Sequence, residues 1–163
     1  MNLQINNKLM GKFPFIVRVY GIYYQEEKGI LVSDELVHGQ FITKFPGGGL
    51  EFGEGTRECL QREMMEETRH DFEIGEHFYT TDFFVPSAFD SAFQVISIYY
   101  LMKAVGAFNQ LISTEKFDFK VKEHGAQSFR FIPLKEMGSD CLTLVIDKKV
   151  GQMIHERVVE DWK

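Results

Sequence analysis

The order of apolar and polar positions divides the chain into short segments. β-Branched and aromatic side chains crowd several of these segments, which is typical of strands. We predict strands at residues 13–24, 30–37, 40–45, 78–85, 93–105 and 127–132. Residues 86–91 are expected to form a loop, and Pro133 ends the last predicted strand.

Two further segments show the features of helices. Residues 56–69 contain neither Gly nor Pro and are rich in Glu, Arg, Leu, Gln and Met, which favours a helix. In the tail, apolar residues recur three or four positions apart, which indicates an amphipathic helix. They are Val150, Met153, Ile154, Val158 and Trp162. Strands on both sides of a central helix, followed by a terminal helix, predict an α+β layered fold, and we expect one domain over residues 1–163.

Composition narrows the classes of protein that fit this pattern. The chain has 163 residues, of which 44% are hydrophobic and 26% are charged, as in an ordinary globular domain. Acidic residues outnumber basic residues by 24 to 18, and the resulting net charge of −6 disfavours duplex nucleic acid as a partner. No apolar run approaches the roughly 18 residues of a membrane span, so no membrane association is predicted. Cys59 and Cys141 are too few for a disulfide scaffold or a closed zinc site, which suits a cytoplasmic location.

The predicted central helix carries a cluster of acids. Glu63, Glu66 and Glu67 lie at i, i+3 and i+4 and share one helical face, within an arc of about 100°. None of them has a Lys or Arg partner at i+4. Such a face is either a solvated acidic surface or a site for a hard cation such as Mg²⁺ or Mn²⁺.

The glycine-rich stretch before this acidic helix is predicted to form a turn, and it favours the cation site. Five of the fourteen glycines fall between Gly47 and Gly55. Glycine permits positive φ and a close approach of the backbone, so a loop carbonyl can join the carboxylates around a metal ion.

Residues 48–70 resemble the Nudix box, G-x5-E-x7-R-E-U-x-E-E-x-G-U, in which U is a bulky aliphatic residue. Seven of the nine specified positions match, namely Gly48, Glu54, Arg62, Glu63, Met64, Glu66 and Glu67. Two positions depart, because Arg69 replaces the late glycine and His70 replaces the closing aliphatic residue. That glycine normally caps the helix at positive φ, so Arg69 is expected to strain or shift the cap.

By this resemblance the chain is identified as a member of the Nudix hydrolase family. The resemblance implies an α/β/α sandwich with a mixed sheet between helices. It also implies hydrolysis of the pyrophosphate bond of a nucleoside diphosphate linked to another group, X, by water that Mg²⁺ or Mn²⁺ activates. Nucleotide sugars, ADP-ribose and (deoxy)nucleoside triphosphates are all open as substrates. A small phosphorylated nucleotide is the expected partner, and a homodimer is compatible with the family.

The resemblance also assigns roles to individual box residues. The implied metal ligands are Glu63, Glu66, Glu67 and the carbonyl of Gly48. Arg62 would orient a ligating glutamate, with Glu54 as its partner or as a stabiliser of the helix start. The general base is open between a box glutamate, Glu63 or Glu66, and Glu123, which precedes the last predicted strand.

The sequence is less specific about substrate contacts. Lys44 precedes the glycine stretch and Arg18 lies in an apolar strand, and each either meets a phosphate or faces solvent. Phe83, Phe84 and Phe89 either stack on a base or pack in the core, and core packing is favoured. Pro86 stands sixteen residues beyond the box, a spacing that ADP-ribose-type members often show.

Two other functions compete with hydrolysis. The first is a non-catalytic Nudix module that senses a nucleotide, although such a module is expected to lose box carboxylates, which this chain retains. The second is an interaction protein with an acidic face and no small ligand.

Overall fold

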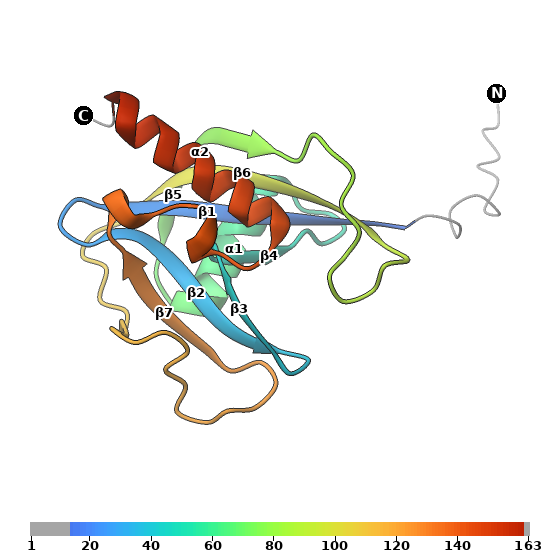
Figure 1. Cartoon of the computed structure of the whole chain (residues 1–163), viewed down its shortest axis with the longest axis horizontal. Coiled ribbons are helices and arrows are strands. Elements are labelled where there is room, and N and C mark those ends of the chain that lie inside the picture. Colours follow the sequence, from blue (N-terminus) through green and yellow to red (C-terminus); the bar gives the residue numbers. More distant parts are fainter. Residues whose placement is uncertain (1–13, 162–163) are drawn as a thin grey trace.

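A mixed β-sheet forms the centre of the molecule (Figure 1). The computed structural model describes residues 14–161, with side chains to residue 157. The strands are β1 (Phe15–Gln25), β2 (Gly29–Val37), β3 (Gln40–Lys44), β4 (Gly47–Gly49), β5 (Phe72–Thr80), β6 (Gln94–Ala104) and β7 (Gln127–Ile132). Their order is β3-β2-β1-β6-β5, with β4 beside β1 and β7 beside β2. Strands β1 and β6 are parallel and the other pairs are antiparallel.

Strand β1 belongs to two parts of this sheet that diverge. Its middle lies between β6 and β4, where Arg18 is opposite Ser97 on one side and Gly49 on the other. Its end pairs with β2 at only two positions, Tyr24–Ile30 and Gln25–Gly29. The two parts therefore separate away from this hairpin, and residues of β1, β2 and β3 line one cavity.

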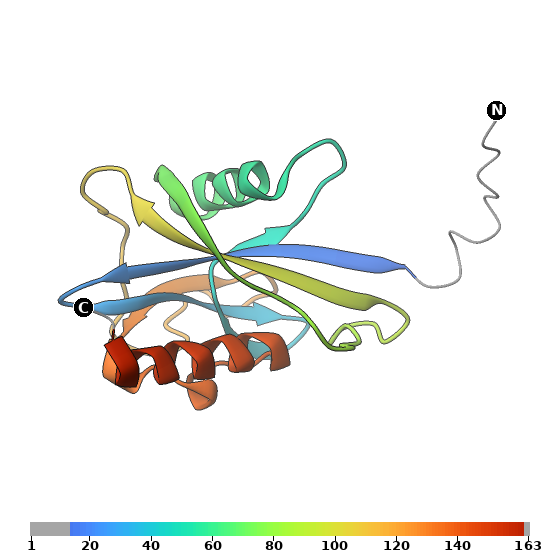
Figure 2. The same ribbon diagram turned by 90° about the horizontal axis from the view of Figure 1, so that it is seen from above.

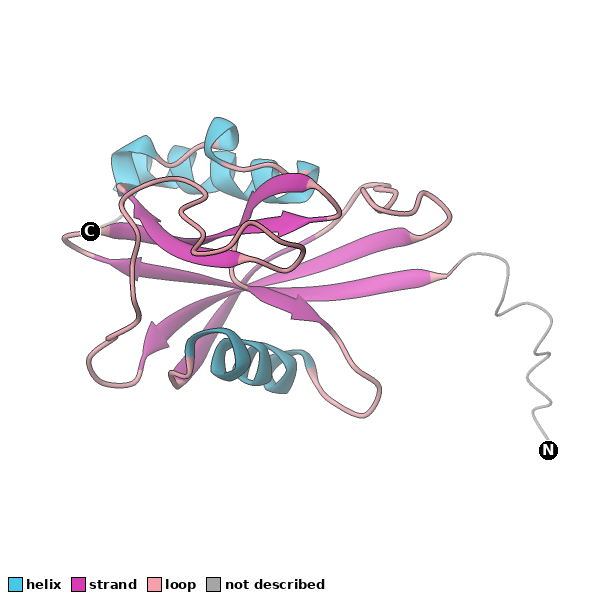
Figure 3. Ribbon diagram, turned by 90° about the horizontal axis from the view of Figure 1, so that it is seen from below, coloured by secondary structure: helices cyan, strands magenta, loops and turns pink. Residues whose placement is uncertain are grey.

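Two helices cover opposite faces of the sheet (Figures 2 and 3). Helix α1 (Thr56–Thr68) buries Cys59, Leu60 and Met64 against one face. Helix α2 (Val145–Asp161) follows two short 3₁₀ helices, Leu134–Glu136 and Ser139–Cys141, and covers the other face. Its buried residues include Val150 and Ile154. The predicted α+β sandwich, with a mixed sheet between helices, is thus confirmed.

The ends of α1 show how the chain accommodates the departures from the box. The helix begins where the Gly55 N–H donates to the Glu58 carboxylate at 2.7 Å. It ends at Arg69, which adopts the left-handed conformation (φ 54°) while its N–H donates to the Met65 carbonyl at 3.0 Å. Arg69 therefore forms the helix cap at the position where the box has glycine. Its positive φ is strained for a residue with a Cβ atom. His70 packs edge-on against Phe108 at 5.2 Å, as an aromatic replacement for the aliphatic residue.

Most predicted elements agree with the structure to within two residues. The main correction is the strand predicted at residues 78–85, because β5 covers Phe72–Thr80 instead. The first half of this strand was not predicted because it contains Gly75, Glu73 and Glu76, and neither glycine nor glutamate is typical of strands. After Thr80 the chain leaves the ladder and returns to β6 only at an isolated bridge, Pro86–Gln94.

Two details of the prediction concern the glycine stretch and the tail. Residues Gly47–Gly49, expected as a turn, form β4 through pairing with β1. The predicted apolar face of the tail helix is buried at Val150 and Ile154, whereas the side chain of Val158 and all of Trp162 lie outside the described residues. Within residues 14–161, no helix is long and apolar enough to cross a membrane.

Candidate active site

The glycines of β4 lie directly against the acidic face of α1. A Cβ atom on Gly48 would come within 2.4 Å of the Glu63 carboxylate, so only glycine leaves room for this contact. Gly47 has a φ of 127°, and its N–H donates to Glu67 Oε2 at 3.3 Å. Two box carboxylates therefore reach the backbone of β4, the approach that the glycine stretch indicated.

Arg62 organises the outer side of this contact. Its guanidinium donates to Glu54 Oε1 at 2.7 Å, to Glu63 Oε1 at 3.0 Å and to the Gly49 carbonyl at 3.0 Å. The side chain of Glu66, which is 61% exposed, lies 3.5 Å from Arg62. The hydrogen bond from Arg62 lowers the pKa of Glu54 to about 2. Arg62 thus ties α1 to the loop before it and fixes the orientation of Glu63.

Lys44 organises the inner side, and here the charges are buried. Its ammonium lies 2.8 Å from Glu35 Oε1 and 3.9 Å from Glu67 Oε1, and it donates to the Gly47 carbonyl at 2.9 Å. Burial alone would lower the pKa of Lys44, but the attraction of Glu67 and Glu35 outweighs burial and raises it. Burial raises the pKa of Glu67, because it destabilises the charged carboxylate. An additional positive charge nearby would stabilise that carboxylate.

The donor groups at this contact suit a hard divalent cation. They are the carboxylates of Glu63 and Glu67 against the glycines of β4, with the Glu66 carboxylate on the same helix, and oxygen donors are what Mg²⁺ and Mn²⁺ prefer. Among residues 14–161, no three His, Cys, Asp or Glu side chains already converge as a metal cluster. Instead the acids are divided, with Glu63 and Glu66 near Arg62 and Glu67 near Lys44. The cradle at Gly48, which a Cβ would fill, is the feature that fits a bound ion.

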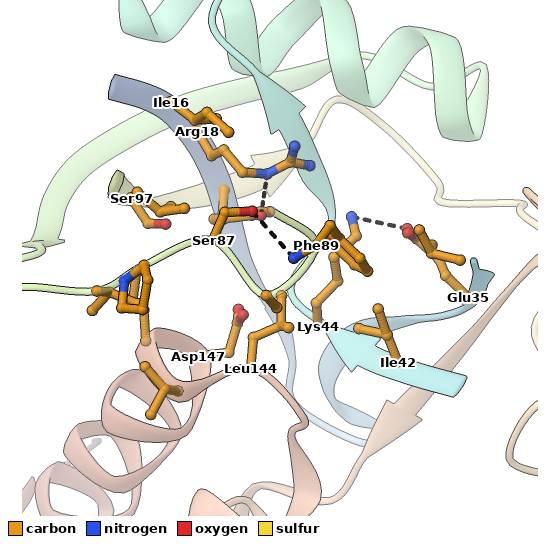
Figure 4. A pocket seen from close by; sticks show the side chains of 18 residues that line it. Ile16, Arg18, Glu35, Ile42, Lys44, Ser87, Phe89, Ser97, Leu144 and Asp147 are labelled. Carbon is orange, nitrogen blue, oxygen red and sulfur yellow. Dashed lines mark hydrogen bonds and ion pairs between the residues drawn. The ribbon is translucent and has the colours of Figure 1, made fainter. Parts of the chain in front are cut away.

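A cavity of about 320 Å³ adjoins Lys44 on the α2 side of the sheet (Figure 4). Its walls come from β1, β2, β3, β6, the loop at residues 85–89 and the start of α2. Arg18 and Lys44 both line this cavity. The sequence alone did not decide whether they face a ligand site or solvent. The Arg18 Nε donates to the Tyr20 hydroxyl at 2.5 Å, and the pKa of Arg18 is raised chiefly by Tyr20, with contributions from Glu35 and Glu63.

Asp147 closes this cavity at the start of α2. It is 1% exposed and accepts hydrogen bonds from the Phe45 N–H and the Tyr99 hydroxyl, each at 3.3 Å. Burial raises its pKa to about 6. Sequence reasoning missed Asp147 and Glu35, which line the cavity. For Asp147 a signal existed, because this acid directly follows the apolar residues 144–146 at the start of the helix.

The remaining predicted residues lie in different places. Phe84 is 71% exposed and is not part of the cavity wall, whereas Phe89 and Pro86 line it. Glu123 lies in the loop between β6 and β7, where it lines a second cavity together with Glu67. Glu123 is therefore on the same side as a box carboxylate, and the substrate contact assigned to Phe84 stays a prediction.

Comparison with known proteins identifies the family of the chain. The family model of the NUDIX domain matches residues 14–151, most of the chain, so the chain belongs to the Nudix hydrolase family. A search of curated proteins found no match.

Solved structures show the same fold at low sequence identity. A MutT protein from Methanosarcina mazei Go1 is 19% identical over 92% of this chain and 99% of that chain, with a TM-score of 0.65. An ADP-ribose pyrophosphatase from Streptococcus suis 89-1591 is 15% identical over 91% and 94%, with a TM-score of 0.56. A UDP-X diphosphatase is 15% identical over 89% of this chain and 64% of that chain, with a TM-score of 0.57.

Proposed function

We propose that the protein hydrolyses the pyrophosphate bond of a nucleoside diphosphate linked to another group, with the help of a divalent cation. The observation that carries this proposal is the contact between β4 and α1, where the Glu63 and Glu67 carboxylates lie against Gly48 and Gly47. The proposal includes a single cytoplasmic domain over residues 1–163 that acts on a small phosphorylated nucleotide and assembles as a homodimer.

The box residues would hold the ion. Glu63, Glu66, Glu67 and the Gly48 carbonyl provide oxygen donors for Mg²⁺ or Mn²⁺, and Arg62 keeps Glu63 turned toward β4. When bound, such an ion polarises phosphoryl oxygens and lowers the pKa of coordinated water. Without added positive charge, the acids at this contact would repel a diphosphate, which is itself anionic.

The protein supplies two cations of its own on the cavity side. Lys44 borders both Glu67 and the cavity, and Arg18 of β1 lines the same cavity. A diphosphate at this border would be positioned by these two side chains while the apolar cavity wall received the nucleoside. Positioning and neutralisation of charge are the main requirements of attack at phosphorus.

The proton from the attacking water has two candidate acceptors. One is a box glutamate, Glu63 or Glu66, and the other is Glu123. Glu123 lines the second cavity together with Glu67, and this shared cavity supports it as a candidate.

A substrate panel tests the proposed reaction. Nucleoside triphosphates, nucleotide sugars and ADP-ribose are incubated with Mg²⁺ or Mn²⁺ in ¹⁸O-labelled water, and the products are identified by mass. We expect turnover of at least one substrate and a loss of about 100-fold or more in kcat for Glu67→Gln. Glu73→Gln, which neutralises an exposed acid on β5, is the matched control and should behave as wild type.

Two outcomes would contradict the proposal. Equal kcat values for wild type and Glu67→Gln would remove the box acids from the reaction. Tight nucleotide binding with no turnover across the panel would instead indicate the nucleotide-sensing module.

A further inference from the structure

The buried ammonium of Lys44 lies between two carboxylates but much closer to one of them. It is 2.8 Å from Glu35 Oε1, a contact that Figure 4 marks, and 3.9 Å from Glu67 Oε1. The first distance is that of a charged hydrogen bond, whereas the second is beyond hydrogen-bond reach. Glu35 and Lys44 line the first cavity, and Glu67 lines the second. The ammonium is therefore held on the side of the first cavity.

Glu35 is itself fixed by neutral hydrogen-bond donors. Its Oε1 accepts from Ser33 Oγ at 2.9 Å and from Gln127 Nε2 at 3.1 Å. Gln127 Nε2 also donates to Ser33 Oγ at 2.9 Å, and Gln127 lies opposite Glu35 in the pairing of β2 with β7. Burial alone would raise the pKa of Glu35, but Lys44 and these hydrogen bonds outweigh burial and lower it. Glu35 is thus a charged partner with a fixed position.

The surroundings of Glu67 leave it more available. Its Oε2 accepts from the Gly47 N–H at 3.3 Å, and its Oε1 has the longer contact with Lys44. If the ammonium moved onto Glu67, it would occupy the carboxylate lone pairs that a divalent cation needs. It would also repel such a cation at close range in a buried site. The position of Lys44 therefore decides how well Glu67 can serve a metal ion.

We infer that Glu35 is a positioning residue, which holds Lys44 away from Glu67 and so keeps Glu67 free to bind the divalent cation. Lys44 opposes the ion at Glu67, and Glu35 limits this opposition while it keeps the ammonium at the first cavity. Without Glu35, the ammonium moves to Glu67, the other carboxylate within 4 Å among the described residues. The inference rests on the proposed function, because it takes Glu67 as a metal ligand.

Two variants that change the same ion pair test the inference, because they should change metal affinity in opposite directions. Mn²⁺ affinity is measured without nucleotide, by electron paramagnetic resonance of the free ion. We expect Glu35→Gln to bind Mn²⁺ about tenfold more weakly, since the ammonium then competes for Glu67. We expect Lys44→Met to bind it about tenfold more tightly, since the opposing charge is gone. Damage to the fold would weaken binding in both variants.

Controls separate this local effect from a change in net charge. Glu73→Gln and Lys103→Met alter the charge by the same amounts on exposed side chains of β5 and β6. Both should bind Mn²⁺ as wild type does, because exposed charges at a distance are screened.

The double variant Glu35→Gln/Lys44→Met shows whether Glu35 acts through Lys44. Without the ammonium there is nothing for Glu35 to restrain, so its affinity should lie within about threefold of that of Lys44→Met. The double variant also leaves Glu35 and Lys44 without an unpaired charge at either position. It therefore replaces Lys44→Met if thermal unfolding shows that the single variant is not folded.

The outcomes distinguish this inference from the proposed function. Wild-type affinity in Glu35→Gln, or weaker binding after removal of the ammonium, would overturn the inference and leave the cation site intact. An equal loss on Glu35→Gln with and without Lys44 would also overturn it, because Glu35 would then act on the ion directly. No Mn²⁺ binding by wild type would overturn the cation site, and the inference with it.

Discussion

Two networks of ion pairs meet at the contact between β4 and α1, one centred on Arg62 and the other on Lys44. The two central side chains differ in burial. Arg62 binds Glu54 and Glu63 at the outer side, with its side chain 25% exposed. Lys44 binds Glu35 and lies near Glu67 on the inner side, with its side chain 5% exposed. The acids of the two networks are about equally buried, but solvent reaches Arg62 more than Lys44, so the first network is partly screened and its main effect is orientation. The second is desolvated, so its charges depend strongly on one another and can respond to a ligand.

The largest expected effect follows from removal of the buried cation. Lys44→Met leaves Glu35 and Glu67 buried without it, and we expect the free energy of unfolding to fall by about 3 kcal/mol at neutral pH. Urea denaturation measures this change. Lys103→Met, which removes an exposed lysine of β6, is the control and should cost less than about 0.5 kcal/mol. A loss of the same small size for Lys44→Met would show that the inner network is screened like the outer one.

The two regions should also respond to pH in opposite directions. The folded pKa of Asp147, which lines the same cavity as Lys44 and Glu35, is about 6, above its ordinary value of 3.8. The folded state therefore favours the protonated form of Asp147. The free energy of unfolding falls as pH rises from 3.8 to about 6, by up to about 3 kcal/mol in total. The folded pKa of Glu54, bound by Arg62, is about 2, below its ordinary value of 4.5. Its contribution is present above pH 4.5 and is lost as pH falls toward 2.

Urea denaturation between pH 3 and pH 8 separates these effects. Relative to wild type, Asp147→Asn should gain stability as pH rises, because the cost of the buried charge disappears. Glu54→Gln should lose stability relative to wild type over the same rise. Differences that change in the same direction for both variants would contradict the contrast between the regions.

An intermediate effect is expected when the charge of Arg62 is kept and its shape is changed. Arg62→Lys retains one positive charge but cannot hold Glu54, Glu63 and the Gly49 carbonyl together. We expect Mn²⁺ affinity to fall about tenfold, since groups that orient ligands act on this scale. Calorimetric titration measures it. An unchanged affinity, with wild-type stability, would remove the orienting role of Arg62.

The smallest effect concerns the end of α1, where neither network is touched. Arg69 holds a φ of 54°, which glycine adopts without strain. We expect Arg69→Gly to raise the free energy of unfolding by about 0.5–1 kcal/mol, the strain of the positive φ less the entropy of glycine. Thermal unfolding measures the gain, and Arg69→Ala, which keeps a Cβ, should show none of it. A loss of stability in Arg69→Gly would mean that the Arg69 side chain stabilises the cap.

The outer network was largely predictable from the sequence, whereas the inner one was not. Arg62, Glu54 and Glu63 lie within one motif, so spacing along a helix places them together. Lys44 was noted, but its partner Glu35 comes from a neighbouring strand and Asp147 from the start of α2, and only tertiary pairing brings these three together. The same limit explains why β4 was expected as a turn, because glycine has little strand propensity and its pairing with β1 decides the structure.

The most direct test of the central claim is Mn²⁺ binding followed by electron paramagnetic resonance of the free ion. The claim is that the acidic face of α1 and the glycines of β4 together form a cation site. Wild type and Glu73→Gln should bind Mn²⁺ with equal affinity, and Glu67→Gln should bind it at least about tenfold more weakly. Equal affinity in all three proteins, or no binding by wild type, would contradict the claim.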